Sequence, residues 1–123
     1  MDDLNQTFAT LKPLLQHYQP PLAPKEEKPG YYDLWSFKPV EIEGRKRKEV
    51  YFAGLVLRKS YVGFYFMPVY AEPETRERIP PELLKLLKGK SCFHIKKLTP
   101  ELVGQIERVL QAGFRRYQER GWV

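Results

Sequence analysis

The feature that most constrains this chain is a 22-residue stretch, EVYFAGLVLRKSYVGFYFMPVY, at residues 49–70. Aromatic and β-branched residues, which favour strands, fill most of it. Its polar break lies at Arg58 and Lys59, near the middle of the stretch. Two apolar runs separated by one short polar break are typical of a β-hairpin. We therefore expect an antiparallel hairpin at the centre of the fold.

A two-residue loop at 58–59 would place Leu57 opposite Ser60, and Gly54 opposite Gly63. Residues that face each other lie on the same side of a sheet. The expected first face holds Tyr51, Ala53, Leu55, Val62, Phe64 and Phe66. The expected second face holds Phe52, Gly54, Val56, Tyr61, Gly63 and Tyr65. A longer loop would change this register.

Two long helices are predicted near the two ends of the chain. The first has Pro13 inside its apolar stripe, and this proline should kink or split the helix. That stripe comprises Leu4, Phe8, Leu11, Leu15 and Tyr18. The second helix has Thr99 as its N-cap and Pro100 at its first position. Its expected buried stripe comprises Leu102, Ile106, Val109, Leu110, Gly113 and Tyr117.

Between the helices, residues 19–30 (QPPLAPKEEKPG) form a proline-rich connector. The other expected elements are strands at 31–37 and 91–97, a turn at Gly44 before a basic run at 45–48, and a short helix at 80–88 that Gly89 ends. Consecutive strands between terminal helices predict an α+β fold. We expect a two-layer sandwich in which the N- and C-terminal helices pack on one face of a mainly antiparallel sheet.

The overall composition favours one cytoplasmic domain over residues 1–123. The chain has a single cysteine, and no apolar run approaches the roughly 20 residues that span a bilayer. The start of the chain lacks the basic, then apolar, pattern of a signal peptide. The net charge of 21 − 15 = +6 favours anionic partners. The run from Lys59 does not fit an RNA-recognition strand, so we do not expect a nucleic-acid partner. We also expect no membrane partner, because no apolar run is long enough to span a bilayer.

The segment GKSCFHIKK, residues 89–97, contains the cysteine and one of the two histidines. Strand alternation sends Phe93 and Ile95 to the core, so Cys92 and His94 join the second face. Two such side chains are too few for a zinc site, and no paired base activates the thiol. We expect no cofactor and no catalytic group. The candidate ligand-binding residues are Phe52, Tyr61, Tyr65, Lys90, Cys92 and His94.

The segments RKSYVGFYFMPVY and IPPELLKLLKGKSCFHIKK, with the ending RYQERGWV, resemble the YdhG-like family of bacterial domains of unknown function. The resemblance covers nearly the whole chain. It implies an architecture similar to that of frataxin, and it raises an iron-chaperone role. His94 stands where asparagine is common in that family. The resemblance therefore implies a fold and no agreed catalytic residues.

We expect a non-enzymatic role in which the second face binds a small molecule or a protein partner, including a second copy of the chain. The chain's own short helix and proline-rich segment could instead cover this apolar face, because large apolar patches are rarely left bare. The alternative function is a frataxin-like iron or metal chaperone. Iron prefers clustered carboxylates. The chain has Asp2 and Asp3, and then no acidic residue until Glu26.

Overall fold

The hairpin predicted from residues 49–70 forms the middle of the sheet in the computed structural model, which describes residues 3–71 and 73–123. The described helices are α1 (Leu4–Gln16), α2 (Pro68–Ala71), α3 (Pro73–Glu77), α4 (Pro81–Leu84) and α5 (Pro100–Glu119). The described strands are β1 (Glu27–Lys28), β2 (Tyr31–Ser36), β3 (Val40–Ile42), β4 (Arg45–Arg47), β5 (Val50–Leu57), β6 (Val62–Phe66), β7 (Leu87–Lys88) and β8 (Cys92–Ile95).

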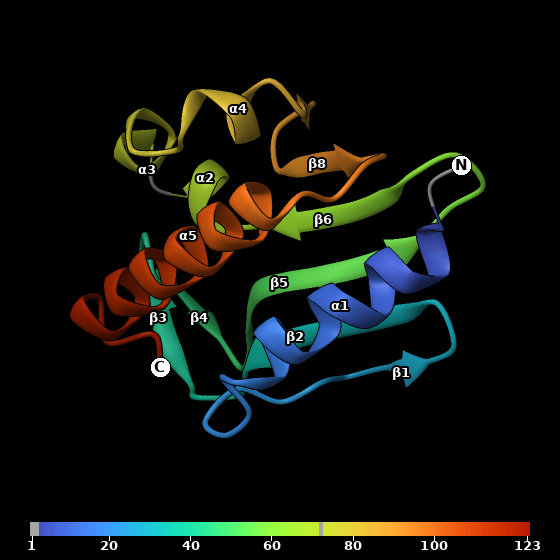
Figure 1. Ribbon diagram of the computed structural model, residues 1–123. Helices are drawn as coiled ribbons and strands as arrows, with labels where there is room; N and C mark the ends of the chain where they lie inside the picture. Colours follow the sequence, from blue (N-terminus) through green and yellow to red (C-terminus); the bar gives the residue numbers. More distant parts are fainter. Residues whose placement is uncertain (1–2, 72) are drawn as a thin grey trace.

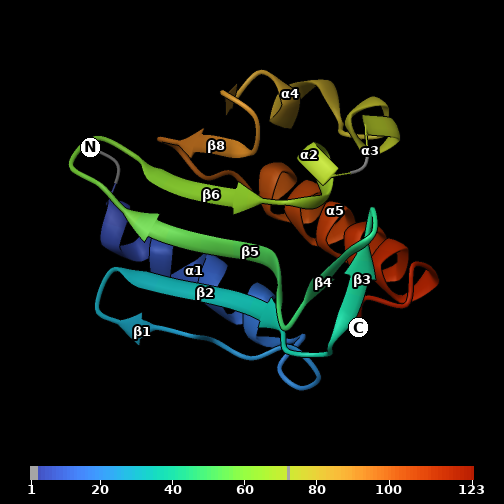
Figure 2. The same ribbon diagram turned by 180° about the vertical axis from the view of Figure 1, so that it is seen from behind.

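Six strands form one sheet in the order β1-β2-β5-β6-β8-β7, and every neighbouring pair is antiparallel. Strands β3 and β4 form a separate hairpin beyond one end of this sheet. The long helices α1 and α5 lie across one face (Figure 1), and the view from behind shows the opposite face without a helix over it (Figure 2). The predicted α+β architecture is therefore confirmed. None of the described helices is long and apolar enough to cross a lipid bilayer.

The N-terminal helix begins at a capped end and runs through its proline. The Asp3 carboxylate accepts hydrogen bonds from the backbone N–H groups of Asn5 and Gln6. Residues Phe8, Leu11 and Leu15 are buried, as the stripe predicts. Pro13 does not split α1, which continues to Gln16. The proline stands near the helix end, so only one backbone hydrogen bond is lost before the helix would stop anyway.

The C-terminal helix follows its sequence pattern closely. Thr99 accepts a hydrogen bond from the backbone N–H of Leu102 at 3.1 Å, and Pro100 occupies the first turn. All six residues of the predicted stripe are buried. A Cβ atom on Gly113 would lie 2.6 Å from Cζ of Phe66, so this glycine lets the helix approach the sheet closely. The α5 backbone is thereby held directly against the core.

The central hairpin has a four-residue loop, 58–61, instead of the predicted two-residue loop. Leu57 pairs with Val62 and Gly54 pairs with Tyr65, so the register differs from the prediction by two residues. The loop closes with a hydrogen bond of 2.9 Å from the Arg58 N–H to the Tyr61 carbonyl. Arg and Lys rarely adopt the left-handed backbone that a two-residue turn needs. Because side chains alternate with a period of two, this shift keeps the predicted faces for most residues.

One strand position breaks the alternation. Leu34 pairs with Ala53, but Trp35 pairs with Tyr51, so Phe52 is the extra residue of a β-bulge. Phe52 and Ala53 are both fully buried beneath the helices, and Tyr51 turns to the other face. The predicted positions of Phe52 on the second face and Tyr51 on the first face are therefore wrong. Strict alternation cannot anticipate a bulge.

The segment after β6 also differs from the prediction. Pro68 ends the strand, and residues 68–71 form α2. The predicted helix at 80–88 is only α4, and Gly89 does not cap it. Gly89 instead adopts φ +74° in the turn between β7 and β8. Its freedom to adopt a left-handed conformation serves a β-turn here.

Candidate binding site on the open sheet face

The sheet face opposite α1 and α5, called the open face below, is formed by two cross-strand rows. Strand pairing aligns one row as Asp33, Gly54, Tyr65 and Cys92, and the other as Tyr31, Val56, Gly63 and His94. Trp35, Tyr51 and Tyr61 complete this surface. In Figure 2 the ribbon of the proline-rich connector follows one edge of this face and α4 lies beyond the opposite edge, so neither backbone crosses it. The short helix therefore does not cover this face, which was one of the alternatives drawn from the sequence.

Two glycines allow the aromatic rings to lie flat on the strands. A Cβ atom on Gly54 would clash with the Tyr51 hydroxyl. On Gly63 it would lie 3.3 Å from Cε2 of Tyr65 and 3.5 Å from Sγ of Cys92. Glycine is therefore required where neighbouring side chains cross the backbone. Tyrosine rings therefore lie flat against the strands of this face and remain partly exposed to solvent.

A shallow groove of about 460 Å³ runs over these rings, which falls within the range of small-molecule sites. Its principal lining side chains are Tyr31, Trp35, Tyr51, Val56, Tyr65 and Met67, with Arg58 at the rim. Trp35, Tyr51 and Met67 also border a second hollow of about 720 Å³ near the β3–β4 hairpin. The open face is thus a concave apolar surface with a few polar groups, the usual composition of a ligand site.

Arg58, Tyr65 and Cys92 form a polar chain across the face. Arg58 is hydrogen-bonded to Tyr65, and Tyr65 is hydrogen-bonded to Cys92. Burial raises the pKa of the Cys92 thiol, and the hydrogen bond from Tyr65 and the positive charge of Arg58 offset this only in part. The thiol is therefore protonated at neutral pH, and a thiolate nucleophile is not stabilised here.

Asp33 closes one side of the open face. Its carboxylate accepts hydrogen bonds from the backbone N–H groups of Lys25, at 2.8 Å, and Glu26, at 3.1 Å. The Tyr31 hydroxyl donates a third hydrogen bond, at 3.1 Å. These bonds hold the proline-rich connector against the edge of the sheet. Asp33 is buried with its oxygens occupied, so its role is to hold this edge in place.

The Lys25 side chain extends this edge over the indole of Trp35. Its ammonium group lies 4.2 Å from the ring centroid and 2.6 Å from a carboxylate oxygen of Glu49. The Trp35 ring packs edge-on against Tyr51, with centroids 5.0 Å apart. Burial raises the pKa of Tyr51 above its ordinary value of 10.0, with smaller contributions from Tyr31 and Asp33. Tyr51 therefore stays neutral and can donate a hydrogen bond at neutral pH.

Four of the six predicted ligand-binding residues come together on the open face. The rings of Tyr61 and His94 stack with centroids 3.8 Å apart and planes 11° apart, and Tyr65 pairs with Cys92. Phe52 lies in the core instead, where it packs against Tyr18, Phe66, Phe114 and Tyr117. Lys90 lies in the β7–β8 turn, and its ammonium group is 5.2 Å from the ring centroid of Tyr70. Lys90 is therefore not part of the groove.

Sequence reasoning missed Tyr31, Trp35, Tyr51 and Arg58, which line the groove. The alternation of YYDLWSF gives a signal for the first two, because Tyr31, Asp33 and Trp35 lie two residues apart. Nothing comparable identifies Tyr51, whose position depends on the bulge at Phe52. Arg58 enters the site because the hairpin loop is longer than predicted.

Among the described residues, no group of three or more His, Cys, Asp or Glu side chains could hold a metal ion. Asp2 and Glu72 lie outside the described residues. Comparisons with protein-family models, curated proteins and solved structures find no match to this chain. The resemblance to the YdhG-like family therefore stays an expectation drawn from the sequence.

Proposed function

We propose that this domain is a non-enzymatic binding protein whose open face takes up a small molecule or a protein partner. The observation that carries the proposal is an aromatic sheet face that none of the described helices covers. Six half-buried aromatic or imidazole rings lie on this face: Tyr31, Trp35, Tyr51, Tyr61, Tyr65 and His94. A monomeric protein seldom leaves such a surface without a use.

The shape of the groove favours a small planar ligand over a large partner. Its volume of about 460 Å³ suits a molecule of one or two rings. Flat tyrosine rings offer stacking surfaces, and their hydroxyl groups offer hydrogen bonds. Arg58 adds a positive charge at the rim, which would favour a carboxylate or another weak acid. We therefore propose a planar aromatic acid as the ligand class.

The proposal can be tested with 2-naphthoate as the probe, by following backbone amide signals in NMR during a titration. We expect shifts centred on Asp33, Gly54 and Tyr65, which lie in one cross-strand row and line the groove. The Tyr65→Ala variant should bind about tenfold more weakly, equivalent to about 1.4 kcal/mol. Tyr70→Ala is the matched control, because Tyr70 is 53% exposed and borders the neighbouring hollow but not this groove.

Three results would count against the small-molecule proposal. An absence of shifts, shifts confined to the helices, or equal loss in both tyrosine variants would each exclude the groove as the site. A protein that forms dimers in sedimentation experiments, and separates on Val56→Lys substitution, would show that a second copy occupies the face. We expect no measurable heat when ferrous iron is titrated into the protein. Micromolar binding in that titration would favour the metal-chaperone alternative.

A further inference from the structure

The open-face groove adjoins the second hollow, at the end of the sheet where the β3–β4 hairpin lies (Figure 2). This second hollow has a volume of about 720 Å³, larger than that of the groove itself. Trp35, Tyr51 and Met67 line both spaces, and all three side chains are half-buried. A ligand in the groove therefore has to pass only these three side chains to enter the second hollow.

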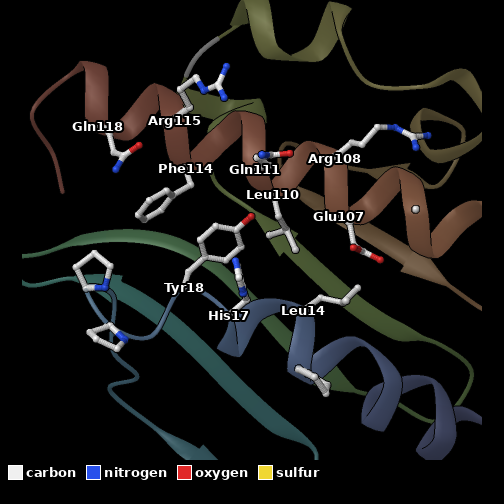
Figure 3. Close-up of a pocket in the computed structure, with 14 residues that line it drawn as sticks. Leu14, His17, Tyr18, Glu107, Arg108, Leu110, Gln111, Phe114, Arg115 and Gln118 are labelled. Atoms are coloured by element: carbon white, nitrogen blue, oxygen red, sulfur yellow. The ribbon is translucent and has the colours of Figure 1, made fainter.

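The hollow between α1 and α5 is not part of this site. It has a volume of about 790 Å³, and among the described residues it shares no lining side chain with the open-face groove. In the close-up (Figure 3), Arg108 and Arg115 extend away from this space and the Glu107 carboxylate points into it. Because the sheet separates it from the open face, a ligand held by Arg58 reaches the second hollow and not this one.

The walls of the second hollow are rich in aromatic rings. Tyr70 comes from α2, Tyr117 from α5, and Trp122 follows α5. The Trp122 ring packs edge-on against Tyr117 with centroids 5.0 Å apart, and Tyr70 is 53% exposed. Both tryptophans of the chain, Trp35 and Trp122, line this hollow. Such rings offer a large apolar contact area, which favours an aromatic occupant.

The charges around the second hollow balance. Its lining has three acidic and two basic side chains: Glu41, Glu43, Glu49, Arg47 and Arg120. Glu49 is paired at 2.6 Å with the Lys25 ammonium group, which adds a third positive charge. Lys90, whose ammonium group lies over the Tyr70 ring, does not line the hollow. The balanced charges favour neither a cation nor an anion, so an uncharged group suits this space best.

The open-face groove has a different charge pattern. Arg58 stands at its rim, and hydrogen bonds from Lys25, Glu26 and Tyr31 occupy the Asp33 carboxylate. The acid group of a ligand therefore belongs at Arg58. The two spaces together favour a molecule with one negative charge at one end and an uncharged ring at the other.

Strand β5 indicates the length of such a molecule. Val56 lines the groove, Tyr51 lines both spaces, and Val50 lines the second hollow. At roughly 3.3 Å per residue, the strand from Val50 to Val56 extends about 20 Å. An occupant of both spaces is therefore elongated, and it is longer than the molecule of one or two rings that the groove holds alone.

Met67 is the adaptable member of the three shared side chains. Its backbone N–H donates to the Phe52 carbonyl at 2.9 Å, which fixes the main chain. Trp35 packs against Tyr51, with centroids 5.0 Å apart, and the Lys25 ammonium group lies 4.2 Å from its ring centroid. Methionine has an unbranched, flexible side chain that repacks easily. A rotation of the Met67 side chain would let a ligand extend from the groove into the second hollow.

We propose that the groove and the second hollow form one extended site for an elongated aromatic monoacid. This inference rests on the proposed function, because it takes the acid-bearing ring to lie in the open-face groove beside Arg58. The uncharged ring extends past Met67 and lies against Trp122 and Tyr70. The groove thus selects the charge of the ligand, and the second hollow selects its length.

Two probes that differ in length test this inference by calorimetry. 2-Naphthoate fills the groove, and 6-phenyl-2-naphthoate has an added ring opposite the acid group. The longer acid should bind the native chain about tenfold more tightly. Trp122→Ala should remove most of this gain and Tyr70→Ala about threefold of it, whereas neither variant should weaken 2-naphthoate binding. Tyr61→Ala is the matched control, because Tyr61 lies on the open face but lines neither space.

The outcomes separate this inference from the proposed function. If 2-naphthoate binds but the added ring brings no gain, the extended site is excluded and the open-face groove remains the site. The same holds if the gain survives in both Trp122→Ala and Tyr70→Ala, or if Tyr61→Ala removes it equally, because the longer acid is then bound only for its greater hydrophobicity. If neither acid binds, the proposed function fails, and this inference with it. A urea midpoint shows whether Trp122→Ala stays folded, and Tyr70→Ala, at an exposed residue, tests the second hollow independently.

Discussion

The two faces of the sheet are built from neighbouring residues of the same strands, but they differ in what lies on them. On the face beneath α1 and α5, the side chains of Leu55, Phe64 and Phe93 are fully buried. On the open face, the adjoining Val56, Tyr65 and His94 are only half-buried. Helices therefore bury one face completely. On the other face, the strands are covered only by the face's own side chains, which lie flat and stay partly exposed.

The difference in cover explains the difference in residue types. Phenylalanine and aliphatic side chains carry no polar atom, so helices can seal them at no cost in hydrogen bonds. Tyrosine has an apolar ring and a hydroxyl group, which suits a surface that is dry on one side and wet on the other. The open face is thus adapted to partial exposure, which is also what a binding surface requires.

The largest effect should come from Phe52, the residue whose face the sequence pattern places wrongly. Phe52→Ala removes a fully buried ring that packs against Tyr18, Phe66 and Phe114. We expect it to lower the free energy of unfolding by about 3 to 5 kcal/mol in urea titrations. Val56→Ala, on the open face of the same strand, should cost only about 1 kcal/mol. Similar costs for the two variants would contradict the assignment of Phe52 to the sealed face.

The same contrast separates the parts of the fold that can be predicted from the sequence from those that cannot. The start and the buried stripe of α5 were predictable, because Thr99, Pro100 and the apolar spacing all indicate the same element. The faces of β6 and β8 were predictable too, since alternation alone decides them. These elements are governed by local chemistry, and no distant contact alters their pattern.

The errors arise where a distant contact decides the local structure. The bulge at Phe52 lets its ring reach the aromatic cluster of α1 and α5, and the sequence around it gives no signal of this. The loop at 58–61 adds two residues because Arg58 and Lys59 disfavour a tight turn, so Arg58 comes to the groove. Four of the six predicted binding residues therefore lie on the open face, but only Tyr65 of these lines the groove, and Tyr51 and Arg58 could not be predicted.

A second effect compares neighbouring tyrosines on opposite faces of β2. Burial raises the pKa of Tyr32 to about 12, with smaller contributions from Glu27 and Asp33. In the unfolded chain tyrosine titrates near 10, so the folded protein retains a proton that the unfolded chain loses. Stability is therefore fully present below pH 10 and falls as the pH rises from 10 to 12. At about 1.36 kcal/mol for each pH unit, the loss is roughly 2 to 3 kcal/mol.

This pH effect is checked by spectrophotometric titration of tyrosinate together with urea unfolding at several pH values. The Tyr32→Phe variant should lose the titration step near pH 12, and its stability should fall less steeply between pH 10 and 12. Tyr31→Phe, which changes the adjacent tyrosine on the open face, should keep that step. A step that survives in Tyr32→Phe and disappears in Tyr31→Phe would reverse the assignment.

A third effect concerns two glycines of α5, Gly113, which packs against the sheet, and Gly104, which has space beside it. A Cβ atom on Gly113 would lie 2.6 Å from Phe66 and 2.9 Å from Pro68, so Gly113→Ala should cost about 2 kcal/mol. On Gly104 the nearest atom would be a flexible Arg108 nitrogen at 3.6 Å. Gly104→Ala should therefore stabilise the protein by up to about 1 kcal/mol, because alanine favours helix. Thermal unfolding of the two variants measures this, and a shift in the same direction for both would contradict the close approach at Gly113.

The smallest effect concerns the hydrogen bond that ties α5 to the bulge. The Tyr117 hydroxyl donates to the Tyr51 carbonyl at 2.6 Å, one residue before Phe52. Tyr117→Phe keeps the buried ring and removes this donor, so we expect a loss of about 1 kcal/mol in urea unfolding. Tyr70→Phe, at a residue 53% exposed, should change stability by less than about 0.5 kcal/mol. Amide shifts in NMR add a second measurement. Changed amide shifts at residues 51–53 in Tyr117→Phe would show that α5 stabilises the bulge, and therefore the position of Tyr51 on the open face. Unchanged shifts there, with the full loss of stability, would show that the strands form the bulge without help from α5.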